Sequence, residues 1–315
     1  MCVAVFLLCW ARMGVAHDIS PGAIIMLTRR TAERQFFLRP DDDTNQILLY
    51  CLAVAAKRCN MGVILPSFLS DHHHTSLVDR DARSPEFTEH FHKLTARAMN
   101  ALRGRSENLW SCAAPNVVRL VDRAAVMDKL VYAATNPVKH GLVERVADWP
   151  GVNGLEALLE QRTITVKRPK HFFSPDGDMP EEETLELVLP PELGDPDEFR
   201  RELRERVAAV EAEYAAERAR TGRRVLGRRA VLEQSWLDRP SSPPAPGGAL
   251  RPTIATKNPV ARIAALHRNA VFLDAYNLAR QLWLAGFDVV FPAGTYWLRR
   301  FARITVADPI PHSLY

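Results

Sequence analysis

Two kinds of hydrophobic pattern alternate along the first half of the chain, and this alternation restricts the available folds more than any other feature. Apolar or β-branched runs typical of strands occupy residues 23–30, 61–70, 71–79 and 116–121. Apolar side chains recur at helical spacing within residues 41–59, 84–104 and 121–137. The predicted order is therefore strand, helix, two strands, helix, strand, helix.

The ends of these elements carry recognisable signals. For the helix at 84–104 we expect Ser84 as the N-cap and Pro85 at the first helical position, with Gly104 ending the helix. Pro137 ends the last helix, because the residue before a proline is disfavoured in helical geometry. Pro66 lacks a backbone N–H and weakens the strand prediction at 61–70.

The element order predicts an α+β fold in which helices pack on an antiparallel sheet, as in the ferredoxin-like class. A chain of 315 residues has room for further compact units. We predict a mainly helical C-terminal region and these divisions: a disordered N-terminal extension (1–20), a domain carrying the fold (21–155), an acidic linker (156–197), a charged helical segment with a Pro-rich linker (198–248) and a small basic module (249–315).

Charge is distributed unevenly along the chain. Residues 151–197 contain 4 Lys and Arg against 11 Asp and Glu, whereas residues 249–304 contain 8 against 2. The formal net charge of +4 permits a polyanionic partner without requiring one. The basic C-terminal part is a weak indication of nucleic-acid binding.

Cysteine usage and hydropathy indicate a cytoplasmic protein without a membrane segment. The 5 cysteines are odd in number and form no CxxC pair, so the sequence indicates neither a disulfide framework nor a zinc ribbon. Residues 1–16 contain an apolar run, but it is too short to span a bilayer, and no positive charge precedes it.

The stretch SDHHHTSLVD (70–79) contains three consecutive histidines. Side chains alternate between the two faces of a strand, so His72 and His74 share one face and His73 points to the other. Two imidazoles on one face supply half of a metal site. A polar loop is the alternative interpretation of such a run.

Tyr132 and Asn136 are four residues apart, one helical turn along the same face. Asn136 directly precedes Pro137, so its side chain lies at the helix end. Tyr132 alone is typical of a half-buried tyrosine, but beside an HxH strand it is a candidate nucleophile near a metal.

Several motifs together resemble one family. TRRTAERQFFLRP, SDHHHTSLVD, EFTEHFHKLTARAMN, ENLWS and YAATNPVKHGLVERVADWPG occur in the order found in the REP-associated tyrosine transposases, a branch of the bacterial single-tyrosine HUH transposases. The resemblance covers about residues 21–151, and its most specific part is 132–150. It implies that residues 21–155 form a DNA-nicking domain.

By this resemblance, each site residue has an expected role. The family's HxH metal ligands correspond to His72 and His74, its amide ligand to Asn136 and its nucleophile to Tyr132. The expected cofactor is Mg²⁺ or Mn²⁺, which prefers hard ligands and open coordination positions. The implied reaction cleaves single-stranded hairpin DNA and leaves a 5′-phosphotyrosine.

Four basic residues are candidates for binding DNA phosphates: Arg29, Arg30, Arg34 and Lys139. A solvated basic edge is the alternative for each of them. Asp71 and His73 stand where the family usually has asparagine and a bulky hydrophobic residue. The sequence therefore also leaves open a hairpin-DNA-binding protein that has lost catalysis, and it leaves open a homodimer.

Overall fold

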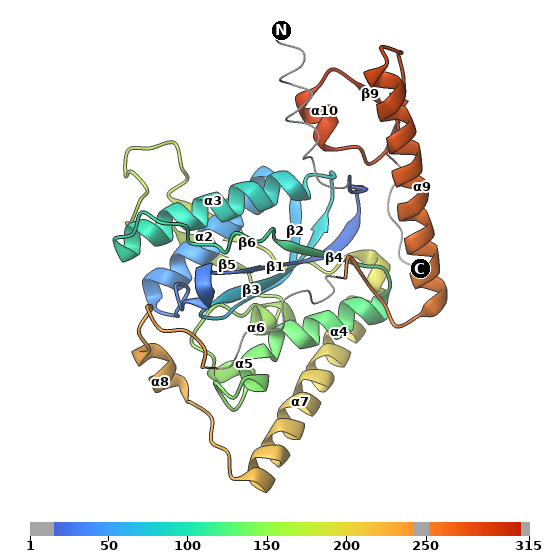
Figure 1. Cartoon of the computed structure of the whole chain (residues 1–315). Helices are drawn as coiled ribbons and strands as arrows, with labels where there is room; N and C mark the ends of the chain where they lie inside the picture. Colours follow the sequence, from blue (N-terminus) through green and yellow to red (C-terminus); the bar gives the residue numbers. More distant parts are fainter. Residues whose placement is uncertain (1–15, 242–251, 310–315) are drawn as a thin grey trace.

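The computed structural model describes residues 16–241 and 252–309 (Figure 1). Most of the predicted N-terminal extension and the end of the Pro-rich linker lie outside the described residues. Within the described ranges, no helix is long and apolar enough to cross a membrane.

A five-stranded sheet forms the centre of the fold, in the order β2-β3-β1-β4-β7. Its strands are β1 (Ala23–Arg30), β2 (Met61–Phe68), β3 (His72–Asp79), β4 (Asn116–Leu120) and β7 (Ile254–Ala255). Each neighbouring pair among β2, β3, β1 and β4 is antiparallel, and β7 adds to β4 in parallel. The predicted α+β class and element order are confirmed, whereas the parallel fifth strand was not predicted.

Helices cover both faces of the sheet (Figure 1). One face packs against α2 (Asp42–Arg58) and α3 (Ser84–Arg103); the other packs against α4 (Arg123–Ala134), α6 (Leu155–Leu159) and α7 (Pro196–Thr221). Strand alternation divides the core accordingly: Ile25 and Leu27 join the first cluster, and Ile24 and Met26 join the second.

The start of α3 differs from its prediction. Arg83 occupies the N-cap position and Ser84 is the first helical residue, so the expected Ser84 cap is wrong. The backbone N–H groups of Arg83 and Ser84 donate to the Asp79 carboxylate at 2.7 and 2.8 Å. An acidic side chain from the end of β3 thus satisfies the helix N-terminus. Gly104 ends the helix in the left-handed region, as expected.

Strand β2 continues through Pro66 because it is the edge strand. A register irregularity lies between Val63 and Leu65. Loop segments cover the outer side of β2: the Gly154 N–H donates to the Pro66 carbonyl at 2.8 Å, and the Val188 N–H donates to the Val63 carbonyl at 2.8 Å.

Residues after 155 contribute to the same two hydrophobic clusters. The hairpin of β5 (Ile164–Lys167) and β6 (Glu182–Leu185) adds Val166 and Leu185 to the cluster under α2. Helix α7 adds Phe199, Leu203 and Val207 to the cluster under α4. The proposed domain division stays a prediction, but the described core extends well beyond residue 155.

The C-terminal part is largely helical, as expected. It contains α8 (Arg228–Glu233), α9 (Pro259–Leu284), β8 (Val290–Phe291), α10 (Trp297–Phe301) and β9 (Thr305–Val306). Figure 1 shows α9 in red, running along the outside of the molecule, and its first turns pack against Ile254 of β7. One-turn helices complete the fold: η1 (Ala32–Arg34), α5 (Asn136–Lys139), η2 (Val146–Asp148) and η3 (Pro191–Leu193).

Candidate active site

His72 and His74 project from β3 toward the face that α4 covers. His72 lies opposite Arg30 of β1, and His74 lies opposite Thr28. Their ring centroids are 5.0 Å apart in an edge-to-face arrangement. Strand alternation thus brings the two imidazoles together as the spacing predicted.

Each imidazole is oriented through its Nδ1 atom. Nδ1 of His72 lies 2.6 Å from an Asp71 carboxylate oxygen, and Nδ1 of His74 lies 2.8 Å from the Thr28 hydroxyl. The Nε2 atom of His74 is buried and has no hydrogen-bond partner among the described residues. This is the arrangement of metal-ligating histidines, which are held at one nitrogen and bind metal with the other.

Asp71, which stands where asparagine was expected, helps to orient the His72 ring. Its carboxylate forms a hydrogen bond with His72 and lies 3.8 Å from the Arg34 guanidinium. Burial raises the pKa of Asp71, but the hydrogen bond from His72 and the charges of His72 and Arg34 outweigh it, so that the pKa lies below its ordinary value. The carboxylate therefore stays ionised beside His72.

His73 points to the opposite face of the sheet and is fully buried. Its Nε2 lies 2.9 Å from Nε2 of His92, whose Nδ1 lies 3.0 Å from the Arg29 guanidinium. Its Nδ1 lies 2.9 Å from the Thr75 hydroxyl. Burial, and then the charges of His72 and Arg29, lower the pKa of His73 to about 3. His73 is a neutral core residue, separated from His72 and His74 by the sheet.

Tyr132 comes from the last turn of α4. Its ring centroid is 5.2 Å from that of His74, and the residue is 40% exposed, so the ring contacts the histidine face while remaining accessible. Lys129 and Lys139 place their ammonium groups 5.7 and 5.0 Å from the ring centroid. Lys129 was not predicted, although it lies one turn before Tyr132 and helical spacing would have indicated it.

Asn136 is 1% exposed, and both atoms of its side-chain amide lack hydrogen-bond partners among the described residues. Buried amides are almost always hydrogen-bonded, since an unpaired one costs about 1–3 kcal/mol. The end of α4 contacts the sheet next to His74: the Ser67 hydroxyl, whose residue pairs with His74, donates to the Ala133 carbonyl at 2.8 Å.

The residues fit a divalent ion. His74 Nε2 and the Asn136 amide oxygen are unused buried acceptors, and His72 shares the strand face with an oriented ring. Two imidazoles and an amide oxygen suit Mn²⁺ or Mg²⁺ better than a thiolate-preferring metal. In the described part of the chain, no three His, Cys, Asp or Glu side chains gather as a metal cluster, so this ligand set depends on the amide.

The four basic candidates separate into two groups. Arg30 is exposed and pairs with His72, Arg34 lies against Asp71, and Lys139 lies over Tyr132. Arg29 instead belongs to the opposite face, where it contacts His92 and lies 5.6 Å from the centre of the Trp110 ring. The structure therefore brings three of the four to the histidine face.

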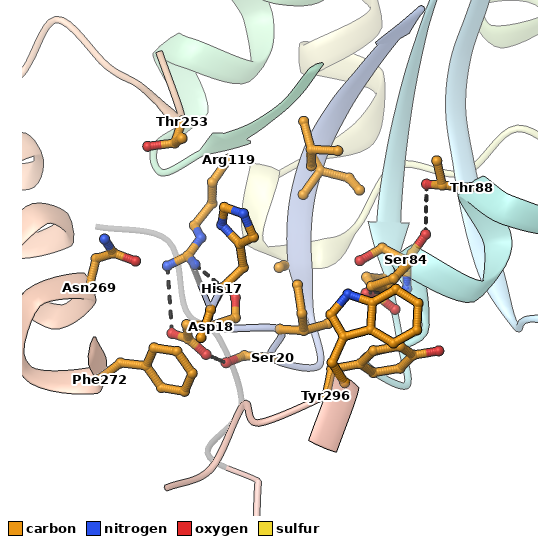
Figure 2. A pocket seen from close by; sticks show the side chains of 18 of the residues that line it. His17, Asp18, Ser20, Ser84, Thr88, Arg119, Thr253, Asn269, Phe272 and Tyr296 are labelled. Atoms are coloured by element: carbon orange, nitrogen blue, oxygen red, sulfur yellow. Dashed lines mark hydrogen bonds and ion pairs between the residues drawn. The ribbon is translucent and has the colours of Figure 1, made fainter. Parts of the chain in front are cut away.

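The described residues also enclose a cavity of about 750 Å³ away from this site. It lies between the β1 and β4 end of the sheet, α3, and the C-terminal segments α9 and α10 (Figure 2). Arg119, Asp18 and Ser20 form one interaction chain within it. Its lining contains none of His72, His74, Tyr132 or Asn136. We place the candidate active site at the histidine face, because His72, His74 and Tyr132 lie together there.

Comparisons with known proteins give limited similarity. No protein-family model and no curated protein matches the chain. Among solved structures, it is similar to a REP-associated tyrosine transposase bound to a REP hairpin, with a TM-score of 0.40 and 17% identity over 47% of this chain and 86% of the other. It is also similar to a protein described as a transposase from Deinococcus radiodurans R1, with a TM-score of 0.27 and 18% identity over 34% and 85%.

Proposed function

We propose that this chain is a metal-dependent nickase and strand transferase for single-stranded DNA, with Tyr132 as the nucleophile. One observation carries the proposal: a solvent-accessible tyrosine at the end of α4 contacts His74, one of two oriented histidines, and a buried amide without a partner among the described residues follows at the start of α5. The motif resemblance supports the same assignment.

The chain's own residues have separable tasks. His72, His74 and Asn136 would hold Mg²⁺ or Mn²⁺, and the bound ion would polarise the oxygens of the scissile phosphate. Lys129 and Lys139 place two positive charges beside the Tyr132 ring, where an approaching phosphate is attracted.

The reaction balances without an energy-rich cofactor. The Tyr132 oxygen forms a bond to phosphorus while the bond from phosphorus to the 3′ oxygen breaks; the tyrosine proton leaves to solvent, and the departing 3′ oxygen takes up a proton from solvent. The products are a 5′-phosphotyrosine and a free 3′-hydroxyl. A 3′-hydroxyl can attack the phosphotyrosine in turn, which gives strand transfer.

The proposed partner is single-stranded DNA that forms a hairpin, as the motif resemblance implies. Arg30, Arg34 and Lys139 lie on the histidine face and are proposed to bind backbone phosphates. Phosphate contacts of this kind make affinity fall with salt.

The decisive experiment incubates the full chain with hairpin oligonucleotides and Mn²⁺, followed by a denaturing gel. We expect a covalent protein–DNA adduct with the parent and none with Tyr132→Phe, which removes one oxygen and keeps the ring. Tyr214→Phe on α7 is the matched control and should form the adduct normally. Equal cleavage by Tyr132→Phe would contradict the mechanism.

The alternative from the sequence, a hairpin-binding protein without catalysis, predicts a different result. The parent would then bind hairpin DNA but form no adduct with either Mg²⁺ or Mn²⁺. The same gel, read beside a native binding assay, separates the two functions.

A further inference from the structure

A run of arginines follows the end of α7. Residues 220–232 contain five arginines and no acidic residue: Arg220, Arg223, Arg224, Arg228 and Arg229. All five are exposed. We call residues 220–232 the arginine segment, and Figure 1 shows it between the end of α7 and α8. The chemistry proposed for Tyr132 uses none of these side chains.

Most of these charges are not neutralised within the chain. Arg229 pairs with Glu233 at 2.7 Å. The side chains of the other four arginines form no hydrogen bond or ion pair with any described residue. Like charges this close in sequence repel one another, so an anion that binds among them is stabilised.

Two glycines set the path of the arginine segment. Gly222 ends α7 with a φ of 68°, and Gly227 precedes α8 with a φ of 86°. Residues with side chains disfavour such values, so the sequence itself specifies where the chain leaves one helix and enters the next.

The middle of the arginine segment is attached to the loop that follows α5. The Leu226 N–H donates to the Gly141 carbonyl at 2.8 Å, and the next N–H donates to the next carbonyl at 2.9 Å. Gly141 lies two residues after Lys139, whose ammonium lies 5.0 Å from the centre of the Tyr132 ring. The arginine segment therefore runs beside the candidate active site.

The end of the arginine segment is attached as well. Val231 of α8 is fully buried in the cluster that contains α4. A few residues later, the Asp238 carbonyl accepts from the Phe36 N–H at 2.8 Å, next to η1. Arg34 of η1 lies 3.8 Å from Asp71. Along the chain, the arginine segment thus lies between two attachments that both adjoin the histidine pair.

We propose that the arginine segment binds the phosphate backbone of the DNA that enters the candidate active site, so that the chain after α7 forms one wall of the DNA interface. The inference rests on the proposed function, which makes DNA the partner. Guanidinium groups suit phosphates because their N–H donors match two phosphate oxygens at once. A backbone that is already held in place loses less conformational entropy on binding.

Fluorescence anisotropy with a labelled hairpin oligonucleotide tests the proposal in EDTA, so that only binding is measured. Arg223→Gln with Arg224→Gln removes two charges from the arginine segment. The matched control is Arg201→Gln with Arg204→Gln, which removes two exposed, unpaired charges of the described α7 about 30 Å from Arg220. Both double variants have the same net charge.

We expect the substitutions in the arginine segment to weaken binding by about 10-fold or more, and the control to leave binding nearly unchanged. The slope of log affinity against log salt should become shallower by about 1.8 if the lost contacts are to the duplex stem, or by about 1.4 if they are to unpaired strand. Equal losses in the two double variants would indicate net charge alone and overturn the proposal.

The same protein preparations separate this inference from the proposed nickase. If affinity depends on the arginine segment but the parent forms no covalent adduct, the inference stands and the nickase fails. If the parent forms the adduct but its affinity does not depend on the arginine segment, the nickase stands and the inference fails. A parent that binds no DNA would overturn both.

A tethered iron chelate tests whether DNA lies against the arginine segment. Cys2, Cys9 and Cys112 are replaced by serine, and the buried cysteines stay. The chelate is attached at Leu226→Cys, a position that is 43% exposed, or at Arg204→Cys as the control. Radicals formed at the iron should cleave the bound oligonucleotide from position 226 and not from position 204. Absence of cleavage from position 226 in a protein that binds the oligonucleotide would overturn the proposal.

Discussion

The side-chain amide of Asn136 is expected to lower the stability of the folded chain. This amide is buried with no partner in the described structure, while the surrounding residues Pro137 and Val138 are apolar. An unsatisfied buried amide destabilises the folded state unless something binds it. The ligand role that we propose for Asn136 would supply that missing interaction.

Asn136→Leu, a change of similar volume, should therefore have opposite effects on stability in metal-free buffer and in buffer with Mn²⁺. In metal-free buffer it removes the unpaired amide and should raise the free energy of unfolding by about 1–3 kcal/mol. With Mn²⁺ present, the stabilisation that the metal gives the parent should disappear. Urea unfolding with EDTA and with Mn²⁺ measures both effects; a variant less stable than the parent in EDTA would show that the amide is already satisfied.

His72 and His73 are neighbours with different expected roles. His73→Ala should leave the Mn²⁺ affinity nearly unchanged, because its ring lies on the opposite face, but it should lower stability by removing buried packing and hydrogen bonds. His72→Ala should abolish Mn²⁺ binding with little effect on the core. Calorimetric titration of both variants checks this, and the reverse result would refute the assigned faces.

At the scale of elements, α3 is joined to the sheet through a buried polar contact. His92 of α3 meets His73 of β3, and the Trp110 indole N–H donates to the His92 carbonyl at 2.9 Å. These contacts hold β3 against α3 on the face of the sheet opposite the candidate site. The site on the other face depends on the position of that strand.

This contact predicts a pH dependence of stability. Burial, followed by the neighbouring His73 and the charge on Arg29, lowers the pKa of His92 well below its ordinary value. Below about pH 6.5 the unfolded chain then binds more protons than the folded one, so stability should fall as pH falls.

His92→Gln should flatten that dependence by up to about 1.4 kcal/mol per pH unit. Urea unfolding at pH 7.5 and pH 5 compares the variant with the parent. His267→Gln, an exposed histidine on α9, is the control and should leave the slope unchanged. An unaltered slope in His92→Gln would mean that His92 is not the group responsible.

At the scale of the whole molecule, the chain after residue 155 completes the core. Phe199 and Leu203 of α7 are fully buried in the cluster that contains α4, and Val166 and Leu185 close the cluster under α2. Helix α4, which carries Tyr132, packs against the sheet on one side and against α7 on the other, so its outer side is covered only in the longer chain.

A fragment of residues 16–155 should unfold at much lower urea concentration than a fragment of residues 16–241. The shorter fragment exposes the apolar surface that α7 and the hairpin cover, at roughly 25 cal/mol per Å². In the longer fragment, Phe199→Ala should cost about 3–5 kcal/mol. Equal stability of the two fragments would show instead that residues 21–155 form an independent domain.

Short-range patterns in the sequence determined the local part of this protein. Period-two alternation placed His72 and His74 together, helical spacing predicted the helix that carries Tyr132, and the order of apolar runs predicted the antiparallel core strands. Such patterns depend on neighbours within one turn or two residues, so one sequence is sufficient to read them.

Only the tertiary structure decided which distant segments meet. The register of β1 against β3 assigned Arg29 to the core face and Arg30 to the site, and it brought Thr28 to His74. Chain packing made residues after 155 part of the core and added β7 to the sheet. These outcomes depend on contacts between residues far apart in the chain, which periodicity does not encode.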